Sequence, residues 1–458
     1  MSMTSENQDF IEAAKTVLSM NDKGAYTAPV NSSMYPHQWL WDSCFIAIGL
    51  RHYDIDRAKT EIFSLLRGQW ANGMMPNMIL AGSKTSNSVN IWRSWVNPNA
   101  PDDVFTSGIT QPPMLAEAIV RLGEELSKPE RRSWYKSTFP ALLAYHEWLY
   151  NERDPHNEGL VLLVHPWETG LDNTPPWMHE LQDHQMPLWI KVVDTLRLTT
   201  AFNFLRNDTK SVSPKDRMTT PDALALYSAQ RRLRRKNYDI KRILTRTQFT
   251  IEDITFNSIL IRANQHLTNI AELINAELPE KLTTSIQKTE KALDQLWDPY
   301  ASQYFSREFV SHRLLKQPSI GTLMPLYAGT ITKERAQQLV QSIENEQMFG
   351  THFPIPSVPV NDQYFDYRRY WQGPTWVNTN WLIIDGLRRY GFDDHAEALR
   401  ESTIDMVKQV GFYEYFSPLD GKPYGAPNFS WTAALIIDLL ENTSKQTTKS
   451  RKNTRSDS

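Results

Sequence analysis

The chain has 458 residues, a formal net charge of −3, and 40% hydrophobic against 22% charged residues, which is typical of a globular protein. Its single cysteine, Cys44, excludes an internal disulfide and a cysteine-rich zinc or iron–sulfur site. The near-neutral charge predicts that the protein has no nucleic-acid partner. Because the sequence shows neither an apolar run of about 18 residues nor a signal peptide, we expect a cytoplasmic protein with no membrane partner.

Apolar residues recur three or four positions apart along most of the chain, as on the buried face of an amphipathic helix. Alternating apolar and polar residues, which would indicate strands, are scarce. The pattern therefore predicts an all-α protein of about fourteen helices. In chain order we expect them over residues 10–18, 39–52, 55–66, 114–122, 128–151, 187–206, 221–236, 255–274, 280–297, 318–328, 332–345, 375–390, 393–410 and 429–442.

Four long segments without this periodicity carry most of the Trp, Pro, Gly and Asn residues, namely 20–36, 72–109, 153–186 and 346–374. Helices of this number fit a barrel of two concentric rings, with the long loops gathered over one mouth. Functional residues concentrate on such loops. We expect a single catalytic domain over residues 1–442, with a lid made by residues 72–109 and 208–250.

Two parts of the chain are strongly basic. Arg residues cluster between residues 231 and 246. Leu224 and Leu226 precede the cluster and Leu233 lies within it, so we interpret this stretch as a helix with one solvated face. Residues 443–458 hold five Lys or Arg and no apolar residue, and they are expected to form a disordered tail.

The signature motifs of several large enzyme classes are absent, including GxGxxG, the phosphate-binding loop, HExxH and GxSxG. The sequence offers carboxylates among aromatic rings instead, since 15 Trp, 18 Tyr and 18 Phe make up 11% of the chain. Glycoside cleavage uses one protonated carboxyl at the leaving oxygen and a second carboxylate near the anomeric carbon. Rings can stack on the faces of the sugar. No metal or cofactor is expected.

The first candidate carboxyl is Asp172, in the segment HPWETGLDNTPPW over residues 165–177. Gly170 and two prolines prevent a regular helix here, so the segment is expected to be a shaped loop. Neighbouring Trp side chains would raise the affinity of Asp172 for its proton, as a general acid requires. Asp172 as a turn-capping residue remains an equal alternative, and Glu168 is an alternative acid.

The second candidate is Glu414, which has Tyr on both sides and directly follows the predicted helix 393–410. A glutamate in such an apolar setting is costly unless it is hydrogen-bonded or functional. An exposed turn remains the alternative. Asp420-Gly421 nearby is interpreted as a plain turn.

Two further segments place Trp beside amides or carboxylates where a loop meets a helix, residues 34–42 and 370–381. Such groups can stack on a polyol and hydrogen-bond its hydroxyls. Core packing is the usual role of Trp, but Asp42 and Asn378 among the rings favour a binding site. Residues 67–73 and 110–113 are weaker members of the same set.

Together these segments resemble glycoside hydrolase family 63, and more narrowly its short single-domain mannosylglycerate and glucosylglycerate hydrolases. The motifs are WLWDS, RGQWxNG, TQPP, WxTGLDN, FNSxxIRAN, YWxGPxWxNxNW and the block from Glu414 to FSWTAA, spread over residues 31–440. The resemblance implies an (α/α)6 barrel that inverts the anomeric configuration without a metal. One departure is Gln372, where many relatives carry Arg; it leaves the identity of the aglycone open.

The resemblance also implies roles for individual residues. Asp172 would be the general acid and Glu414 the general base. Sugar contacts would fall on Tyr35, Trp39, Trp41, Asp42, Gln111, Trp371 and Trp376, with Tyr227 in the lid. A glycerate carboxylate would need a cation, for which Arg93, Lys191 and Arg368 are candidates.

We therefore expect hydrolysis of a small α-glycoside, with glucosylglycerate or mannosylglycerate as the leading substrates. The alternatives are an exo-α-glucosidase acting on oligosaccharides or other glucosides and a non-catalytic sugar-binding barrel. The sequence leaves association into a homo-oligomer open.

Overall fold

Helices account for most of the chain that the computed structural model describes, which comprises residues 5–178, 181, 212–246 and 249–442. The long helices follow the predicted ranges closely, and the all-α prediction is confirmed. The predicted helix 187–206 lies outside the described residues. The helices are α1 (Ser5–Asn21), α2 (Leu40–Leu50), α3 (Ile55–Leu66), α4 (Asn87–Trp92), α5 (Leu115–Glu124), α6 (Lys128–Arg153), α9 (Thr220–Arg235), α10 (Ile240–Thr245), α11 (Ile254–Ile274), α12 (Glu280–Ala292), α13 (Pro325–Ala328), α14 (Lys333–Glu344), α15 (Val377–Arg389), α16 (Asp393–Val410) and a last helix over 430–442.

The strands are short and lie in the connections between helices. The antiparallel order β1-β2-β3 and the pairs β4-β7, β5-β6 and β8-β9 make up the described sheets. Their bounds are β1 (Gln38–Trp39), β2 (Met78–Leu80), β3 (Phe105–Thr106), β4 (Ile251–Glu252), β5 (Trp297–Asp298), β6 (Gln303–Tyr304), β7 (Arg307–Glu308), β8 (Tyr413–Phe416) and β9 (Pro423–Pro427).

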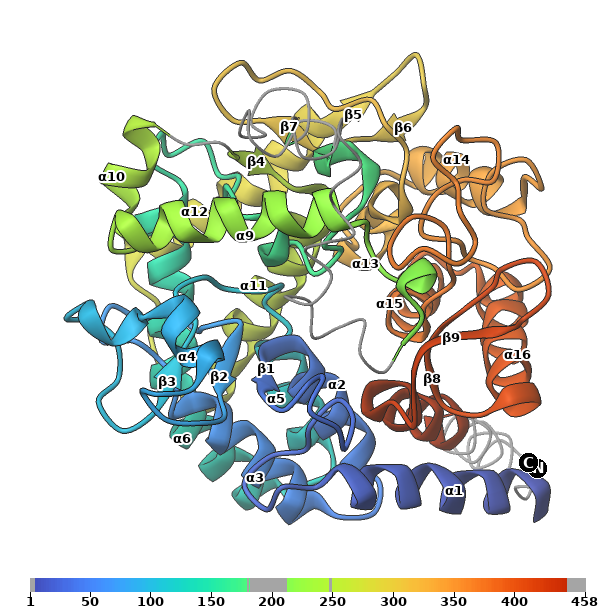
Figure 1. The fold of residues 1–458 in the computed structure, drawn as a ribbon, viewed down its shortest axis with the longest axis horizontal. Helices are drawn as coiled ribbons and strands as arrows, with labels where there is room; N and C mark the ends of the chain where they lie inside the picture. The colour runs from blue at the N-terminus through green and yellow to red at the C-terminus, as the bar shows by residue number, and fades with distance from the viewer. Residues whose placement is uncertain (1–4, 179–180, 182–211, 247–248, 443–458) are drawn as a thin grey trace.

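The most buried helices form a ring, as Figure 1 shows. Going round it, α2 packs on α5, α5 on α11, α11 on α13 and α13 on α15. Trp381 of α15 then donates a hydrogen bond to Asp438 of helix 430–442 over 2.8 Å. Every residue of α2 is buried, whereas α3 buries only one face, as expected for an inner and an outer helix.

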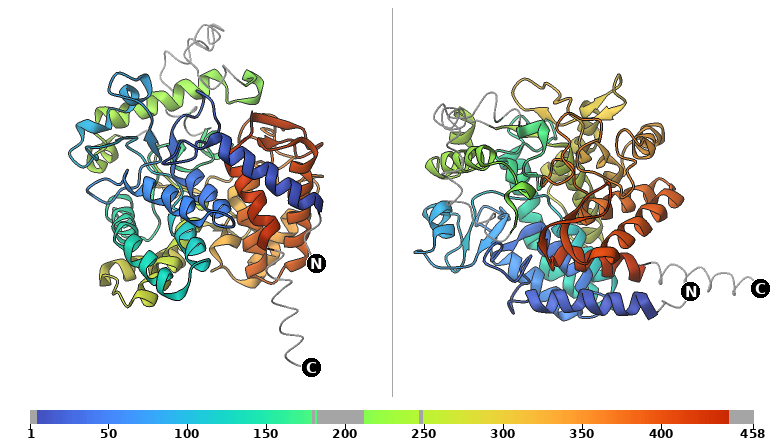
Figure 2. Two further views of the ribbon diagram at one scale, coloured as in Figure 1. Left: turned by 90° about the horizontal axis from the view of Figure 1, so that it is seen from below. Right: turned by 45° about the vertical axis from the view of Figure 1, so that its right-hand side comes forward.

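An outer layer covers this ring. Helix α3 packs on α2, α6 and α12 pack on α11, and α16 packs on α15. Helix α1 runs along the last elements of the chain in both views of Figure 2. Phe10 of α1 stacks on Phe412, and Lys408 of α16 reaches Glu6 at 3.1 Å. Alternating inner and outer helices are the architecture of an (α/α)6 barrel, as predicted.

The ring closes where α2 meets helix 430–442. A Cβ added to Gly49 would lie 2.5 Å from both Cα and O of Ala434, so only glycine permits this backbone approach. Beside this contact, Asp438 forms an ion pair with Arg51 at 2.7 Å and contacts His52 at 2.8 Å. Burial would raise the pKa of Asp438, but the nearby positive charges, that of Arg51 first, and the hydrogen bond with His52 together outweigh burial, so the pKa is lowered.

The segments predicted to form a lid pack against each other and also on the main core, to which Met74 and Leu226 belong. Val89 and Trp92 of α4 share a separate apolar cluster with Leu233 of α9 and Ile243 of α10. The prediction that this pair of segments moves as a lid stays a prediction, and so do the single-domain boundary and the tail, since 443–458 lies outside the described residues. None of the described helices combines the length and apolar character needed to cross a bilayer.

Replacing Gly49 with alanine should destabilise the barrel, because the new Cβ collides with backbone that cannot rotate away. Overpacking of this kind costs at least about 2 kcal/mol. Thermal unfolding followed by circular dichroism measures the loss. The matched control is Gly68→Ala, whose Cβ would meet Cγ1 and Cδ1 of the Ile79 side chain at 2.7 and 2.8 Å, atoms that can move by side-chain rotation. Equal destabilisation by both variants would contradict this account of ring closure.

Candidate active site

A cavity of about 60 Å³ lies where several inner helices begin. Trp41 and Asp42 open α2, Trp431 opens helix 430–442, and Gln111 lies just before α5. Eight of the ten side chains selected from the sequence line this cavity. Its lining comprises Pro29, Tyr35, Trp39, Trp41, Asp42, Gln111, Gly170, Asp172, Tyr370, Trp371, Glu414, Phe429 and Trp431.

Asp172 comes from an irregular loop that follows a short 3-10 helix, Pro166–Glu168. Gly170 of this loop has φ +76°, and a Cβ there would lie 2.6 Å from the Trp41 ring. Burial raises the pKa of Asp172 to about 8, the charge of Glu414 adds to this, and a hydrogen bond from the Tyr370 hydroxyl at 3.3 Å opposes it. Asp172 therefore keeps its proton at neutral pH.

The loop that carries Asp172 is tied to the segment that carries Trp371. The Trp371 backbone N–H donates to Asn173 Oδ1 over 2.9 Å, and Gln372 Nε2 donates to the Asn173 carbonyl over 3.1 Å. Gln372 itself is outside the cavity lining. Gln372, which stands where many relatives carry Arg, therefore positions the loop next to Asp172.

Glu414 lies on β8 at an irregularity in the β8–β9 register, between Tyr413 and Tyr415. Bulges of this kind re-aim side chains and are frequent beside active sites. The carboxylate accepts from the Tyr35 hydroxyl at 3.0 Å and from the Ala426 N–H at 3.0 Å. Gly425 makes room for it, because a Cβ there would lie 2.5 Å from Glu414 Oε2.

Arg217 is a buried cation that contacts residues of the cavity lining. Its Nη1 lies 2.9 Å from both oxygens of Glu414, and both residues are almost fully buried. Its guanidinium lies over the Tyr370 ring at 4.5 Å and donates to the Tyr35 hydroxyl. Burial would lower the pKa of Arg217, but the Glu414 charge, the hydrogen bond to Glu414 and the neighbouring Tyr415 and Tyr370 together outweigh burial and raise that pKa.

A third carboxyl, Asp42, faces the same cavity from the first turn of α2. Burial raises its pKa, and the charges of Glu414 and Asp172 raise it further against the effect of its own backbone hydrogen bond. Three carboxyls therefore share one cavity, where each makes ionisation of the others less favourable.

Trp side chains form one wall of the cavity in two layers. Trp371 lines it and stacks on Trp376, with ring centroids 3.7 Å apart and 5° between the planes. Trp41 packs on Trp371 at 6.3 Å and on Trp431 at 5.6 Å. Trp376 is fully buried outside the lining, so it supports Trp371 from behind.

The structure places two other selected residues away from the cavity lining. Tyr227 lies on α9, is 40% exposed, and packs edge-to-face on Trp167 at 5.6 Å. Glu168 is fully buried and binds Arg153 through both oxygens at 2.7 and 3.0 Å. The carboxylate of Glu168 is thus held by an arginine outside the cavity lining, and the choice between Asp172 and Glu168 as the acid stays a prediction.

The cations selected for a substrate carboxylate also lie elsewhere. Arg93 is exposed at the end of α4, and Arg368 pairs with Asp216 at 2.8 Å. Lys191 lies outside the described residues. The sequence analysis missed Arg217, which sits in the short charged run SPKDR with no local signal, and Tyr370, which was visible in the motif block 370–381.

In the described part of the chain, the His and carboxylate groups close enough to share a metal ion are His156, Glu158 and His312. They lie outside the cavity, and Glu158 is already paired with Arg307 at 2.8 Å. They therefore add nothing to the chemistry of this site.

Comparison with known proteins identifies the family of the chain. Residues 35–432 match the model of the mannosylglycerate hydrolase MGH1-like glycoside hydrolase domain. The mannosylglycerate hydrolase of Thermus thermophilus is 37% identical over 430 residues, covering 93% of this chain and 99% of that protein. The glucosylglycerate hydrolase of Mycolicibacterium hassiacum is 28% identical over 449 residues, covering 93% and 96%.

A solved structure is equally similar. The glycoside hydrolase family 63 mannosylglycerate hydrolase of Thermus thermophilus, in complex with Tris and D-glycerate, matches with a TM-score of 0.83 and 35% identity. The match covers 94% of this chain and 99% of that one. The resemblance to family 63 and its short mannosylglycerate and glucosylglycerate hydrolases is confirmed.

Proposed function

The chain belongs to the mannosylglycerate hydrolase MGH1-like glycoside hydrolase family, and we propose that it hydrolyses a small α-hexosyl glycerate to hexose and glycerate with inversion. The observation that carries the proposal is one small cavity with two carboxyls in different states. Asp172 keeps its proton, while Glu414 is paired with Arg217. Mannosylglycerate and glucosylglycerate are both candidate substrates, since relatives with either name are similar to this chain.

In this proposal the protonated Asp172 donates its proton to the glycosidic oxygen as the bond to the anomeric carbon breaks. Glu414 takes a proton from a water molecule that attacks the anomeric carbon from the opposite face, which inverts the configuration. Asp42 accepts hydrogen bonds from sugar hydroxyls, and the rings of Trp41 and Trp371 contact the sugar faces.

The small volume of the cavity, about 60 Å³, supports a small substrate. Trp and Tyr side chains account for six of its thirteen lining residues. A polysaccharide would need a longer platform of exposed rings. The cytoplasmic location and association into a homo-oligomer stay predictions from the sequence.

Arg217 is the cation that we assign to the glycerate carboxylate. In the absence of substrate it binds Glu414, and a second carboxylate arriving beside Tyr35 and Tyr370 competes for the same guanidinium. When Arg217 turns to the substrate, the oxygens of Glu414 become available to a water molecule. The glycerate moiety therefore contributes to catalysis as well as to binding.

The roles of the two carboxyls are tested by Asp172→Asn and Glu414→Gln. Each should lower kcat at least about 100-fold, the usual size of a general acid or base contribution, with an unchanged circular dichroism spectrum. Rates on mannosylglycerate and glucosylglycerate, and the anomer first released as seen by proton NMR, are the measurements. The control is Asp420→Asn in the exposed turn of the β8–β9 hairpin, which should keep full activity. Retained activity in either cavity variant, or release of the original anomer, would sink the assignment.

The pH profile tests the protonated state of Asp172. Because the acid form is the active one, kcat/KM should fall as pH rises through about 8, the pKa of Asp172. The Tyr370 hydroxyl lowers that pKa through its hydrogen bond, so Tyr370→Phe should move the basic limb to higher pH. Tyr367→Phe, at an exposed tyrosine, is the control and should not move it. A basic limb that stays in place or moves down in Tyr370→Phe would contradict the proposed acid.

The role of Arg217 is tested with an α-hexosyl fluoride, which has no carboxylate of its own. Added D-glycerate should bind Arg217, free Glu414 and speed fluoride hydrolysis by at least about tenfold, as expected for a charge-assisted contact. Glycerol should have no effect. Arg217→Gln should lose the acceleration, whereas Arg368→Gln should keep it. Acceleration that survives in Arg217→Gln would assign the carboxylate to another cation.

A further inference from the structure

We propose that the protein has a second carbohydrate-binding site, in a cavity of about 220 Å³ between α6 and the two segments 70–109 and 237–243. The ligand class is a neutral polyhydroxylated molecule of hexose size. Among the described residues, the two cavities share no lining residue. The inference does not rest on the proposed catalytic roles.

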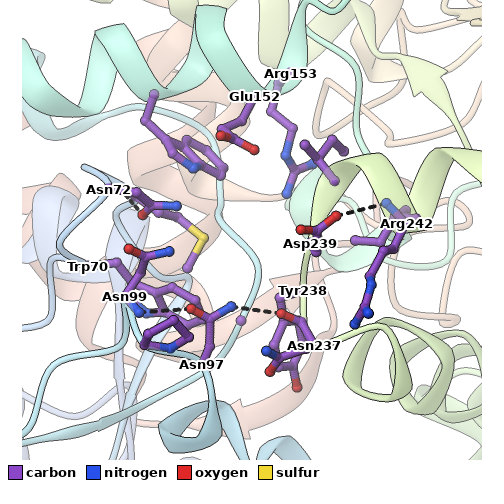
Figure 3. Close-up of a pocket in the computed structure, with 16 residues that line it drawn as sticks. Trp70, Asn72, Asn97, Asn99, Glu152, Arg153, Asn237, Tyr238, Asp239 and Arg242 are labelled. Carbon is purple, nitrogen blue, oxygen red and sulfur yellow. Dashed lines mark hydrogen bonds between the residues drawn. The ribbon is translucent and has the colours of Figure 1, made fainter.

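Three parts of the chain face one another around this cavity. Figure 3 shows Glu152 and Arg153 of α6 on one side and Asn237, Tyr238 and Arg242 on another. The third side is formed by loop residues of the segment 70–109. They are Trp70, Asn72, Met74, Asn97, Pro98, Asn99 and Gly108.

Some of the polar groups hold the cavity in shape. Asn97 Nδ2 donates to the Asn237 carbonyl over 2.7 Å, and Asn97 Oδ1 accepts from the Asn99 N–H over 2.9 Å. The first bond joins the segment 70–109 to the residues after α9, and the second fixes the loop that carries Asn97 and Asn99. A Cβ on Gly108 would lie 2.4 Å from the Tyr238 ring, so the close packing at this corner requires glycine.

Other polar groups have no protein partner. Among the described residues, no hydrogen bond or ion pair is made by the side chains of Glu152, Asn99 or Arg242. They offer carboxylate acceptors, an amide that both donates and accepts, and guanidinium donors. Sugar hydroxyls donate and accept at once, so they can satisfy all three kinds of group.

Aromatic rings supply apolar contact area for the carbon face of a sugar. Tyr238 packs edge-to-face on Trp70 at 6.1 Å, and Trp148 stacks on Tyr145 at 6.2 Å with 19° between the planes. These contacts hold the rings of Trp70, Trp148 and Tyr238 in place. Fixed rings beside amides and carboxylates are the combination that also lines the catalytic cavity.

The charges favour a neutral ligand over an anion. Arg153 is neutralised by Glu168, which binds it through both oxygens. The remaining charged groups are the carboxylates of Glu152 and Asp239 and the exposed guanidinium of Arg242. Because no positive charge is in excess, the site should not attract glycerate or a phosphate.

Fluorine NMR of protein labelled with 5-fluorotryptophan tests this site, since each cavity has its own Trp reporters. Titration with D-mannose or D-glucose should shift the signals of Trp70 and Trp148 saturably, with a Kd different from that reported by Trp41 and Trp371. D-glycerate should leave Trp70 and Trp148 unmoved. Trp→Phe substitutions assign the signals.

Variants then locate the binding. Glu152→Leu and Asn99→Leu should each weaken the Trp70 and Trp148 response at least about tenfold and leave the response at Trp41 and Trp371 unchanged. Glu147→Leu, on the same helix α6 but outside the cavity, is the matched control and should change neither. Circular dichroism checks the fold of each variant.

Three outcomes would overturn the proposal. The first is that neither hexose shifts Trp70 and Trp148. The second is that the shifts survive unchanged in Glu152→Leu and Asn99→Leu. The third is that the shifts disappear in Asp42→Ala, since they would then report binding in the catalytic cavity.

Discussion

The contact between Gly49 of α2 and Ala434 of the last helix closes the barrel, and the catalytic cavity depends on it. Two backbones meet there without a side chain between them, and the charge pair of Asp438 with Arg51 reinforces the junction beside it. The same two helices begin at the cavity, α2 with Trp41 and Asp42 and the last helix with Trp431. Closing the ring therefore brings together residues almost 400 positions apart.

Within the cavity, burial makes charge unfavourable and specific partners decide where a charge is kept. Asp172 accepts a hydrogen bond from Tyr370, but burial prevails and it keeps its proton. Glu414 is surrounded by donors from Arg217, Tyr35 and the Ala426 backbone, which stabilise its charged form. This difference between two carboxyls in one apolar setting supports the opposite roles that we propose for them in proton transfer.

The segment that follows residue 211 contributes to both the proposed catalytic site and the proposed second binding site. Arg217 at its start reaches the carboxylate of Glu414, and Tyr238 near its end forms a wall of the second cavity. Arg153 lines that second cavity and holds Glu168, four residues before Asp172. The loop of the proposed acid is therefore anchored from behind by a side chain of α6.

The sequence by itself determined the helices, because a helix needs only local periodicity and end signals. Both predicted helices 128–151 and 393–410, for example, show this periodicity clearly. It also indicated Asp172 and Glu414, since each lies within a few residues of Gly, Pro and aromatic residues that mark a shaped loop. Tertiary structure decided the rest. Glu168 is held by Arg153, Trp376 is stacked behind Trp371, and Arg217 pairs with Glu414 across 197 positions. Such partners meet only when the ring closes, so no pattern of neighbouring residues in the chain could reveal them.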